Sequence, residues 1–386
     1  MLIQCTKTLL DKIGIKGTEL ASPEGHEDFP KSFLAWHANL VSINRRKAIV
    51  LMNNETRYPV VIYRPSSKDF SKIKELIYEA ISEAFRMEGV RKEVIEAYMA
   101  KAGEISFSKT ANRSMVAKMN NAVRDIEFMN EYLDEKSRIQ RYISIVAGRF
   151  IQLSGANDSF YPVEKTLESL VTIFGIDEHV GVDEVLDIDL YQLKIQINLE
   201  GHDIWRRVLV PSTYSFRHLH HIIQTVFDWQ NYHLHEFTVK GSKNKSLKIV
   251  MDDDPETMEY FNFDDFEMLQ ERFVALEEIL PEFGEVTYEY DFGDSWEHTI
   301  KFEKNVKSKT FQVTFLEGNG ERPPEDVGGA WGFEEYIRIM ENEKHPSYHE
   351  MKVWAENQKE RNLNSEKINQ RLKQVISGYS YSTFVF

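Results

Sequence analysis

The chain has 386 residues, of which 42% are hydrophobic and 28% charged, a balance typical of globular protein of two-domain size. No run of about 18 or more apolar residues occurs and the N-terminus lacks the apolar stretch of a signal peptide, so no membrane association is expected. Cys5 is the sole cysteine, which excludes an internal disulfide and a cysteine-based zinc site, and we expect a reducing, cytoplasmic setting.

The net charge of −15 is divided unevenly along the chain. Residues 1–150 hold 24 of the 47 Lys and Arg and 19 of the 62 Asp and Glu, a balance of +5. The remaining residues hold 23 and 43, a balance of −20. An acidic body repels phosphate backbones, so the sequence disfavours nucleic acid as a partner of the C-terminal part.

The first 150 residues predict a domain in which strands precede helices. The strand segments are rich in β-branched residues, and the helical segments place apolar residues three and four apart. The expected elements are strands at 35–43, 47–52 and 59–65 and helices at 69–89, 91–102 and 114–133. We therefore predict a small α+β domain with a short antiparallel sheet covered by helices.

Residues 151–188 differ in character from the domain before them. The segment opens with turn-forming residues, contains one short expected helix at 166–175 and ends in an acidic stretch. We interpret it as a structured linker between the first domain, residues 1–150, and a second domain, residues 189–386.

The second domain opens on a clear alternation of apolar and polar residues at 191–199, typical of a strand with one buried face. A second strand follows at 204–211, then a helix for which Ser215 is a suitable N-cap. Further strands, a helix at 265–280 and three closing helices complete the predicted order. This β-β-α-β start predicts an α+β fold with a β-grasp-like mixed sheet and covering helices.

The stretch YEYDFGDSWEH, residues 288–298, predicts a hairpin. An odd loop length keeps the apolar residues of both strands on one face. A three-residue loop at 293–295 would pair Tyr290 with His298 and set Asp291 opposite Glu297. On this register His298 is either a hydrogen-bonded core histidine or part of a site.

Histidines form the first candidate constellation. His220 falls on the apolar face of its helix, and the H-x-H pair His233 and His235 is expected side by side on one strand face. Two adjacent imidazoles suit a divalent metal, for which His220, His233, His235 and Asp291 are the candidate ligands. The alternative is a polar belt in which the imidazoles hydrogen-bond to one another and to Asp291 or Asp294.

Arginines and acidic residues form the second candidate constellation. Arg206 and Arg207 lie on opposite faces of one strand, so one of them points towards covered surface. That arginine either clamps a phosphate or carboxylate of a ligand or pairs internally with Asp291 or Glu325. Pro323 and Pro324 fix the loop that presents Glu325 and Asp326, and the glycines after it permit unusual dihedrals. The two adjacent carboxylates suit either general-base and metal chemistry or a turn that leads into a helix and whose acids cap amides.

In this order, the segments IWRRVLVP, LHHIIQ, HLHEF, YDFGDSWEH and PPEDVGG resemble the plasmid pRiA4b ORF-3-like family, over residues 189–372. The first 130 residues, with SKTANRSMVAKMNNA, resemble a separate domain of unknown function that is sometimes joined to it. The resemblance implies an α+β fold and a bacterial plasmid or mobile-element context, and it does not itself imply an activity.

The resemblance also marks the family's polar positions in this chain. They are Trp205, Arg206, Arg207, His220, Gln224, His233, His235, Asp291, Asp294, Trp296, His298, Glu325 and Asp326. Many relatives carry cysteines around the P-P-E-D loop and this chain has none there, so cysteine-dependent metal or thiol chemistry is not expected. The resolvase-like label given to some members finds no basic helix-turn-helix segment here to support it.

Two functions fit these residues. The first is a ligand-binding or partner-binding regulatory module whose pocket carries the polar positions from Arg206 to Asp326, for a small molecule or a protein. The alternative is a metal-dependent hydrolase, acting on phosphoesters as a phosphoesterase or nuclease, in which the His/Asp cluster holds a divalent metal and Glu325 is the base. No nucleotide-binding or hydrolase motif selects between them, and no cofactor is established by the sequence.

Overall fold

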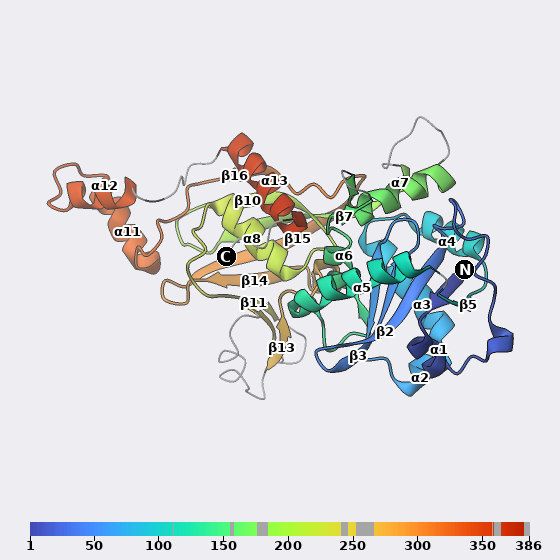
Figure 1. Cartoon of the computed structure of the whole chain (residues 1–386). Helices are drawn as coiled ribbons and strands as arrows, with labels where there is room; N and C mark the ends of the chain where they lie inside the picture. The colour runs from blue at the N-terminus through green and yellow to red at the C-terminus, as the bar shows by residue number, and fades with distance from the viewer. Residues whose placement is uncertain are drawn as a thin grey trace. The chain divides into compact units, whose positions relative to one another are not determined.

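The structure is a computed structural model that describes residues 1–110, 112–154, 158–175, 184–240, 246–251, 266–356, 358 and 364–381. The chain forms two compact units, Met1–Ile188 and Asp189–Phe386 (Figure 1). Both units combine helices with a β-sheet, which confirms the predicted α+β class. Among the helices so described, none has the length and apolar character needed to span a bilayer. The finer boundary predicted at residue 150 stays a prediction.

The first unit is built on a six-stranded sheet. In spatial order its strands are β5 (Ser106–Lys109), β1 (Leu2–Cys5), β2 (Ala35–Ile43), β3 (Arg46–Asn53), β4 (Pro59–Tyr63) and β6 (Ile139–Gln140). The meander β2-β3-β4-β6 is antiparallel, but β1 pairs in parallel with both β2 and β5. The prediction of an antiparallel sheet is therefore wrong, because the N-terminal strand lies between β5 and β2 and runs parallel to both. Cys5 lies buried on that strand.

Seven α-helices of the first unit are described. They are α1 (Lys7–Ile13), α2 (Ser67–Ser71), α3 (Ile73–Met87), α4 (Lys92–Ala102), α5 (Arg113–Phe128), α6 (Arg141–Ala147) and α7 (Pro162–Phe174). The predicted 3.6-residue pattern of α3 buries Ile77, Ile81 and Phe85. Helix α7, from the predicted linker, packs within this unit, where Thr166 Oγ1 donates a hydrogen bond to Thr56 Oγ1 (2.9 Å).

The second unit is built on an eight-stranded sheet. In spatial order its strands are β13 (Phe266–Gln270), β12 (Ser246–Val250), β11 (His235–Lys240), β14 (Glu285–Tyr290), β15 (Trp296–Ser308), β9 (Ile188–Ile197), β10 (Trp205–Pro211) and β16 (Thr314–Asn319). Strands β12 and β13 are parallel, whereas β11 pairs antiparallel with both β12 and β14. The sheet is mixed, as predicted.

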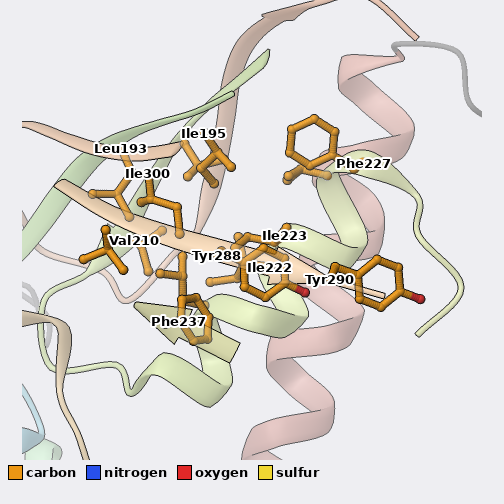
Figure 2. Close-up of a cluster of buried hydrophobic side chains, with 14 of the residues drawn as sticks. Leu193, Ile195, Val210, Ile222, Ile223, Phe227, Phe237, Tyr288, Tyr290 and Ile300 are labelled. Atoms are coloured by element: carbon orange, nitrogen blue, oxygen red, sulfur yellow. The ribbon is translucent and has the colours of Figure 1, made fainter. Parts of the chain in front are cut away.

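Helix α8 (Phe216–Phe227) covers one face of this sheet and forms the core with it. Figure 2 shows Ile222, Ile223 and Phe227 of the helix against Ile195 of β9 and Tyr288 of β14. The alternation read from residues 191–199 thus marks the buried face of β9. The other helices described here are α10 (Leu276–Phe283), α11 (Gly329–Met340), α12 (Tyr348–Glu356) and α13 (Ser365–Tyr381), and α13 packs beside α8.

Two sequence predictions about the second unit fail. The helix expected at 265–280 is instead strand β13, a turn, and helix α10 from Leu276. The pairing of β13 with β12 is a tertiary contact, and it prevails over the helical spacing of the apolar residues.

The hairpin β14–β15 has a five-residue loop at 291–295 rather than the predicted three-residue loop. Tyr290 pairs with Trp296 and Tyr288 pairs with His298, so Glu289, not Asp291, faces Glu297. Both loop lengths are odd, so Val286, Tyr288 and Tyr290 face the core as predicted although the pairing is shifted by two residues. The prediction that Phe292 shares this buried face is wrong, because Phe292 lies in the loop and is 41% exposed.

Candidate functional site

Three loops of the second unit meet beside the Tyr290 end of β14. They are residues 228–234 before β11, residues 291–295 of the hairpin, and residues 320–328 between β16 and α11. The Asp291 N–H donates to Leu234 O (2.9 Å), and the Gly328 N–H donates to Asp294 Oδ2 (3.1 Å). These bonds hold the hairpin loop between the other two.

An imidazole lies among three carboxylates where these loops meet, and we call this group the carboxylate site. His233 Nε2 is 3.1 Å from Asp326 Oδ1, 3.5 Å from Asp291 Oδ2 and 3.9 Å from Glu325 Oε2. Donor atoms of His233, Asp291 and Asp326 all lie within 4.8 Å of one another. Two ligands each about 2.1 Å from one cation are themselves roughly 3 to 4 Å apart, so this spacing fits a shared cation.

Two atoms of the carboxylate site are buried without a hydrogen-bond partner among the described residues: His233 Nε2 and Glu325 Oε2. The carboxylate oxygens around Nε2 lie at ion-pair distances, but none meets hydrogen-bond geometry. Glu325 is fully buried, and burial raises the pKa of its carboxyl. An unsatisfied buried polar group costs on the order of 1–3 kcal/mol, so both atoms call for a partner that lies between them.

The other oxygen of Glu325 is fixed. Glu325 Oε1 accepts hydrogen bonds from the Gln230 N–H and from the Tyr290 hydroxyl (3.4 Å). The Glu325 N–H donates to Gln358 Oε1 (2.9 Å). The side chain is therefore held with Oε2 turned towards His233, whose ring also packs edge-on against Tyr290 (5.7 Å between ring centres).

Asp291 divides its two oxygens between structure and site. Oδ1 accepts the N–H groups of Gly293 (3.0 Å) and Asp294 (3.3 Å), which shapes the loop, while Oδ2 faces His233. Asp291 and Asp326 both have left-handed backbone, with φ of 60° and 57°. Aspartate tolerates this conformation better than most residues, and non-glycine residues with positive φ concentrate at functional sites.

Helix α11 is pressed against the hairpin loop through a glycine. A Cβ on Gly329 would lie 2.8 Å from Asp294 O, and the φ of Gly329 is +66°. Only glycine allows this approach. The glycine pair, predicted to permit unusual backbone dihedrals, thus brings the segment with Glu325 and Asp326 against Asp294.

The candidate arginines do not reach the carboxylate site. Arg206 is buried and donates to the backbone carbonyls of Val226 (2.9 Å) and Asn319 (2.8 Å), whereas Arg207 pairs with Glu303 (2.8 Å) and Glu317. The expectation of internal pairing is right, but the partners are not Asp291 or Glu325. A third arginine, Arg322, was not among the predicted site residues.

Arg322 is fully buried beside the C-terminus of α8. It donates to Phe227 O (3.0 Å) and Asp228 O (2.7 Å), and its guanidinium lies 4.7 Å from the Trp229 ring centre. A cation is favourable where helix carbonyls end. Its position directly before P-P-E-D was the one available signal.

The H-x-H pair is split by the fold. His235 begins β11 and points into the core, whereas His233 precedes the strand, in the loop. The expectation that both imidazoles share one strand face is therefore wrong. Strand pairing starts at His235, opposite Tyr290, which leaves His233 free to turn towards the acids.

His220 and His235 form a separate buried cluster, the histidine stack. Their rings are parallel with centres 3.5 Å apart. His220 bonds to the Tyr288 hydroxyl (2.8 Å), and His235 Nε2 lies 2.8 Å from Glu271 Oε2. Burial, followed by the neighbouring His235, drives the pKa of His220 well below its usual value. Glu271 could not be identified as a partner from the sequence, because it falls within residues 265–280, which were predicted to be a helix.

The remaining candidates lie around the core. Gln224 Nε2 donates to the Tyr288 hydroxyl (3.1 Å), and Trp296 is buried in a stack on Trp229. His298 is fully buried, accepts from Trp229 Nε1 (3.3 Å) and has a pKa lowered by burial to about 4. Of the predicted site residues, the structure brings together four donors: His233, Asp291, Glu325 and Asp326, with Asp294 bracing their loops.

The fold and this site define a two-unit α+β protein whose second unit carries a histidine–carboxylate site. Residues 189–371 match the family model of the plasmid pRiA4b ORF-3-like protein, and residues 2–165 match a domain of unknown function, DUF6933. Over 167 residues the chain is 31% identical to uncharacterized protein y4hQ of Sinorhizobium fredii, covering 42% of this chain and 79% of the relative. The chain belongs to the plasmid pRiA4b ORF-3-like family, as its motifs predicted.

A solved structure is also similar to part of the chain. It is the crystal structure of a protein of unknown function, MM3350, from Methanosarcina mazei Go1. The identity is 31%, the alignment covers 46% of this chain and 97% of that chain, and the TM-score is 0.40.

Proposed function

We propose that the second unit is a ligand-binding module organised around a divalent cation at the carboxylate site. One observation carries the proposal: two buried polar atoms, His233 Nε2 and Glu325 Oε2, lie 3.9 Å apart without a hydrogen-bond partner among the described residues. A cation bound to His233 Nε2, with an open coordination position facing Glu325 Oε2, satisfies the first atom directly and the second through the group that occupies this position, and it offsets the repulsion among three neighbouring carboxylates.

The donor set indicates which cation. His233 offers an imidazole nitrogen, and Asp291 and Asp326 offer carboxylate oxygens. This mixture suits Zn²⁺, Mn²⁺ or Fe²⁺ better than Ca²⁺ or Mg²⁺, which prefer oxygen ligands alone. The lone cysteine, Cys5, belongs to the first unit, so thiolate ligation plays no part. A reducing, cytoplasmic setting remains part of this proposal, as does the absence of nucleic acid from the partners of this acidic unit.

The carboxylate site is open to solvent on one side, and this opening gives a ligand access to the cation. The Asp326 side chain is 64% exposed and that of His233 is 26% exposed, whereas Glu325 is buried behind them. Three protein ligands leave coordination positions on the solvent side, which an oxygen of an incoming ligand can occupy.

A metal-dependent hydrolase is the second candidate, and the same open side favours it. A cation with a free position can hold a water molecule, and Glu325, whose pKa burial raises, is placed beside it as a general base. The histidine stack, which the sequence hypothesis used as metal ligands, plays no part in this version, because its rings are engaged elsewhere in the core.

The test is metal content of the full chain purified without a metal-affinity tag, with Mn²⁺ and Zn²⁺ titrated by calorimetry. We expect about one cation per chain, lost in Asp291→Asn, which retains an oxygen to accept the loop N–H groups but removes the charge. Glu297→Gln makes the same change at an exposed position of the same hairpin and should bind normally. Absence of binding in the natural chain, with stability unchanged by chelators, would overturn the proposal.

A further inference from the structure

Exposed apolar side chains concentrate on the loops that carry the metal donors. Tyr232 (71% exposed) and Leu234 (47%) flank His233 in the chain, and Phe292 (41%) follows Asp291 directly. Trp331, 80% exposed, is the third residue of α11, which begins where the Glu325–Asp326 loop ends. Within the described part of the second unit, the only other large apolar residues this exposed are Leu316 and Val353.

Backbone contacts at the carboxylate site bring together the segments that carry these exposed residues. The bond from the Asp291 N–H to Leu234 O sets Leu234 beside the loop that presents Phe292. The close approach of Gly329 to Asp294 O sets the first turn of α11, with Trp331, against that same loop. We call Tyr232, Leu234, Phe292 and Trp331 the apolar rim.

The apolar rim is not explained by folding. Exposing a large apolar side chain forgoes up to roughly 1.5–3 kcal/mol of burial free energy, and exposed apolar side chains grouped around a polar site are typical of a binding surface. Three of the four members are aromatic. Aromatic faces recognise flat rings by stacking, at a low cost in side-chain entropy.

The charge of the carboxylate site determines which second group the ligand carries in addition to an aromatic ring. Without a cation, Asp291, Glu325 and Asp326 repel an anion; with a divalent cation in place, its open positions attract an anionic oxygen. A ligand held by both features therefore carries an anionic group for the metal and a flat ring for the rim.

We propose that the ligand of the carboxylate site is a small anion bearing an aromatic ring, an inference that rests on the proposed metal-binding function. Two sources share this chemistry: nucleoside phosphates, which present a phosphate and a base, and aromatic carboxylates. The metal holds the anionic group, and Trp331 and Phe292 hold the ring.

The experiment is calorimetry on the full chain, first with Mn²⁺ alone and then, on the Mn²⁺-loaded protein, with adenosine monophosphate or N-acetyltryptophan. Inorganic phosphate and acetate are the ring-free counterparts. At least one ring-bearing anion is expected to bind no less than about fivefold more tightly than its counterpart. An advantage for adenosine monophosphate identifies nucleoside phosphates, and an advantage for N-acetyltryptophan identifies aromatic carboxylates.

Variants separate the rim from the metal. The double change Trp331→Ala and Phe292→Ala replaces exposed side chains and should abolish the ring's advantage while Mn²⁺ still binds at about one per chain. Leu316→Ala, an exposed apolar position on β16, is the matched control and should preserve the advantage.

Two results would overturn the inference. The Mn²⁺-loaded chain could bind neither ring-bearing anion better than its counterpart, or the advantage could survive in the double variant; in both cases metal binding itself stands. A chain that takes up no Mn²⁺ in the first titration refutes the proposed function and this inference with it, and that failure is visible before any anion is added.

Discussion

The second unit holds two histidine–acid groups of opposite design, the carboxylate site and the histidine stack. In the stack, His235 faces Glu271 and lies flat on His220, away from solvent. In the carboxylate site, His233 faces three acids at ion-pair distances, and two of the buried atoms lack a hydrogen-bond partner among the described residues. The difference teaches that residue types alone do not define a site: the histidines of the stack are engaged by Tyr288 and Glu271 inside a closed core, whereas His233 Nε2 and Glu325 Oε2 face each other at a partly open site, which suits a ligand.

The largest expected effect comes from exchanging the two neighbouring histidines for alanine. His235→Ala removes the imidazole that faces buried Glu271 and leaves a gap beside His220, so unfolding free energy should fall by about 3 kcal/mol. His233→Ala removes a partly exposed ring whose edge-on contact with Tyr290 is its one ring contact described above, so the unfolding free energy should change by less than about 1 kcal/mol, while metal binding is lost. Urea unfolding of both variants checks this, and equal destabilisation would remove the contrast between the two groups.

The next largest effect is the pH dependence of stability caused by His298, which is fully buried in the core. Its folded pKa of about 4 lies below the ordinary value near 6.5, so the unfolded chain gains the proton first as pH falls. Neutral His298 contributes about 3 kcal/mol to the free energy of unfolding. This contribution is fully present above pH 6.5 and is lost as the pH falls towards 4. His298→Gln should be less stable at neutral pH but lose less stability between pH 7 and pH 5. Parallel losses in the two proteins would show that His298 is not the group responsible.

Cation binding should stabilise the second unit by an amount set by mass action. At a free concentration one hundred times Kd, a cation that binds only the folded chain adds about 2.7 kcal/mol. Thermal unfolding with Mn²⁺ and with a chelator measures this, and Asp291→Asn should abolish the shift. A shift that persists in Asp291→Asn would place the cation elsewhere.

The smallest expected effect is a change in the stability of the metal-free protein when the buried carboxylate of Glu325 is replaced. Glu325→Gln retains an oxygen that can accept from Gln230 and Tyr290 but removes a buried charge, so the metal-free protein should gain about 1 kcal/mol. Metal affinity should fall in the same variant. Chemical unfolding in chelator checks the gain, and a loss of stability there would mean that Oε2 has a partner even without a cation.

The sequence predicted much of the fold and only part of the site. Alternation located β9 and helical spacing located α3, because both patterns report a face buried along one element. Strand β13 and the parallel entry of β1 were missed, because they depend on pairing between distant segments. The family motifs named all four donors of the carboxylate site, yet they also named His298 and Arg206, which serve the core.

The split of the H-x-H pair shows why the site could not be completed from sequence. Whether His233 and His235 share a face depends on where β11 begins: a strand two residues longer, starting at His233, would place both on one face. The five-residue hairpin loop likewise moved Asp291 out of the strand and gave it the left-handed backbone that turns Oδ2 to His233. Loop geometry and tertiary bonds, not periodicity, assemble the donors.

The most direct test of the central claim is anomalous diffraction from crystals of the full chain soaked in Mn²⁺. We expect one strong peak about 2.0–2.3 Å from His233 Nε2, Asp291 Oδ2 and Asp326 Oδ1, close to Glu325 Oε2. The peak should be missing in crystals of Asp291→Asn. A peak beside His220 and His235 instead, or no peak in the second unit while His233 and Glu325 bond directly to each other, would contradict the account.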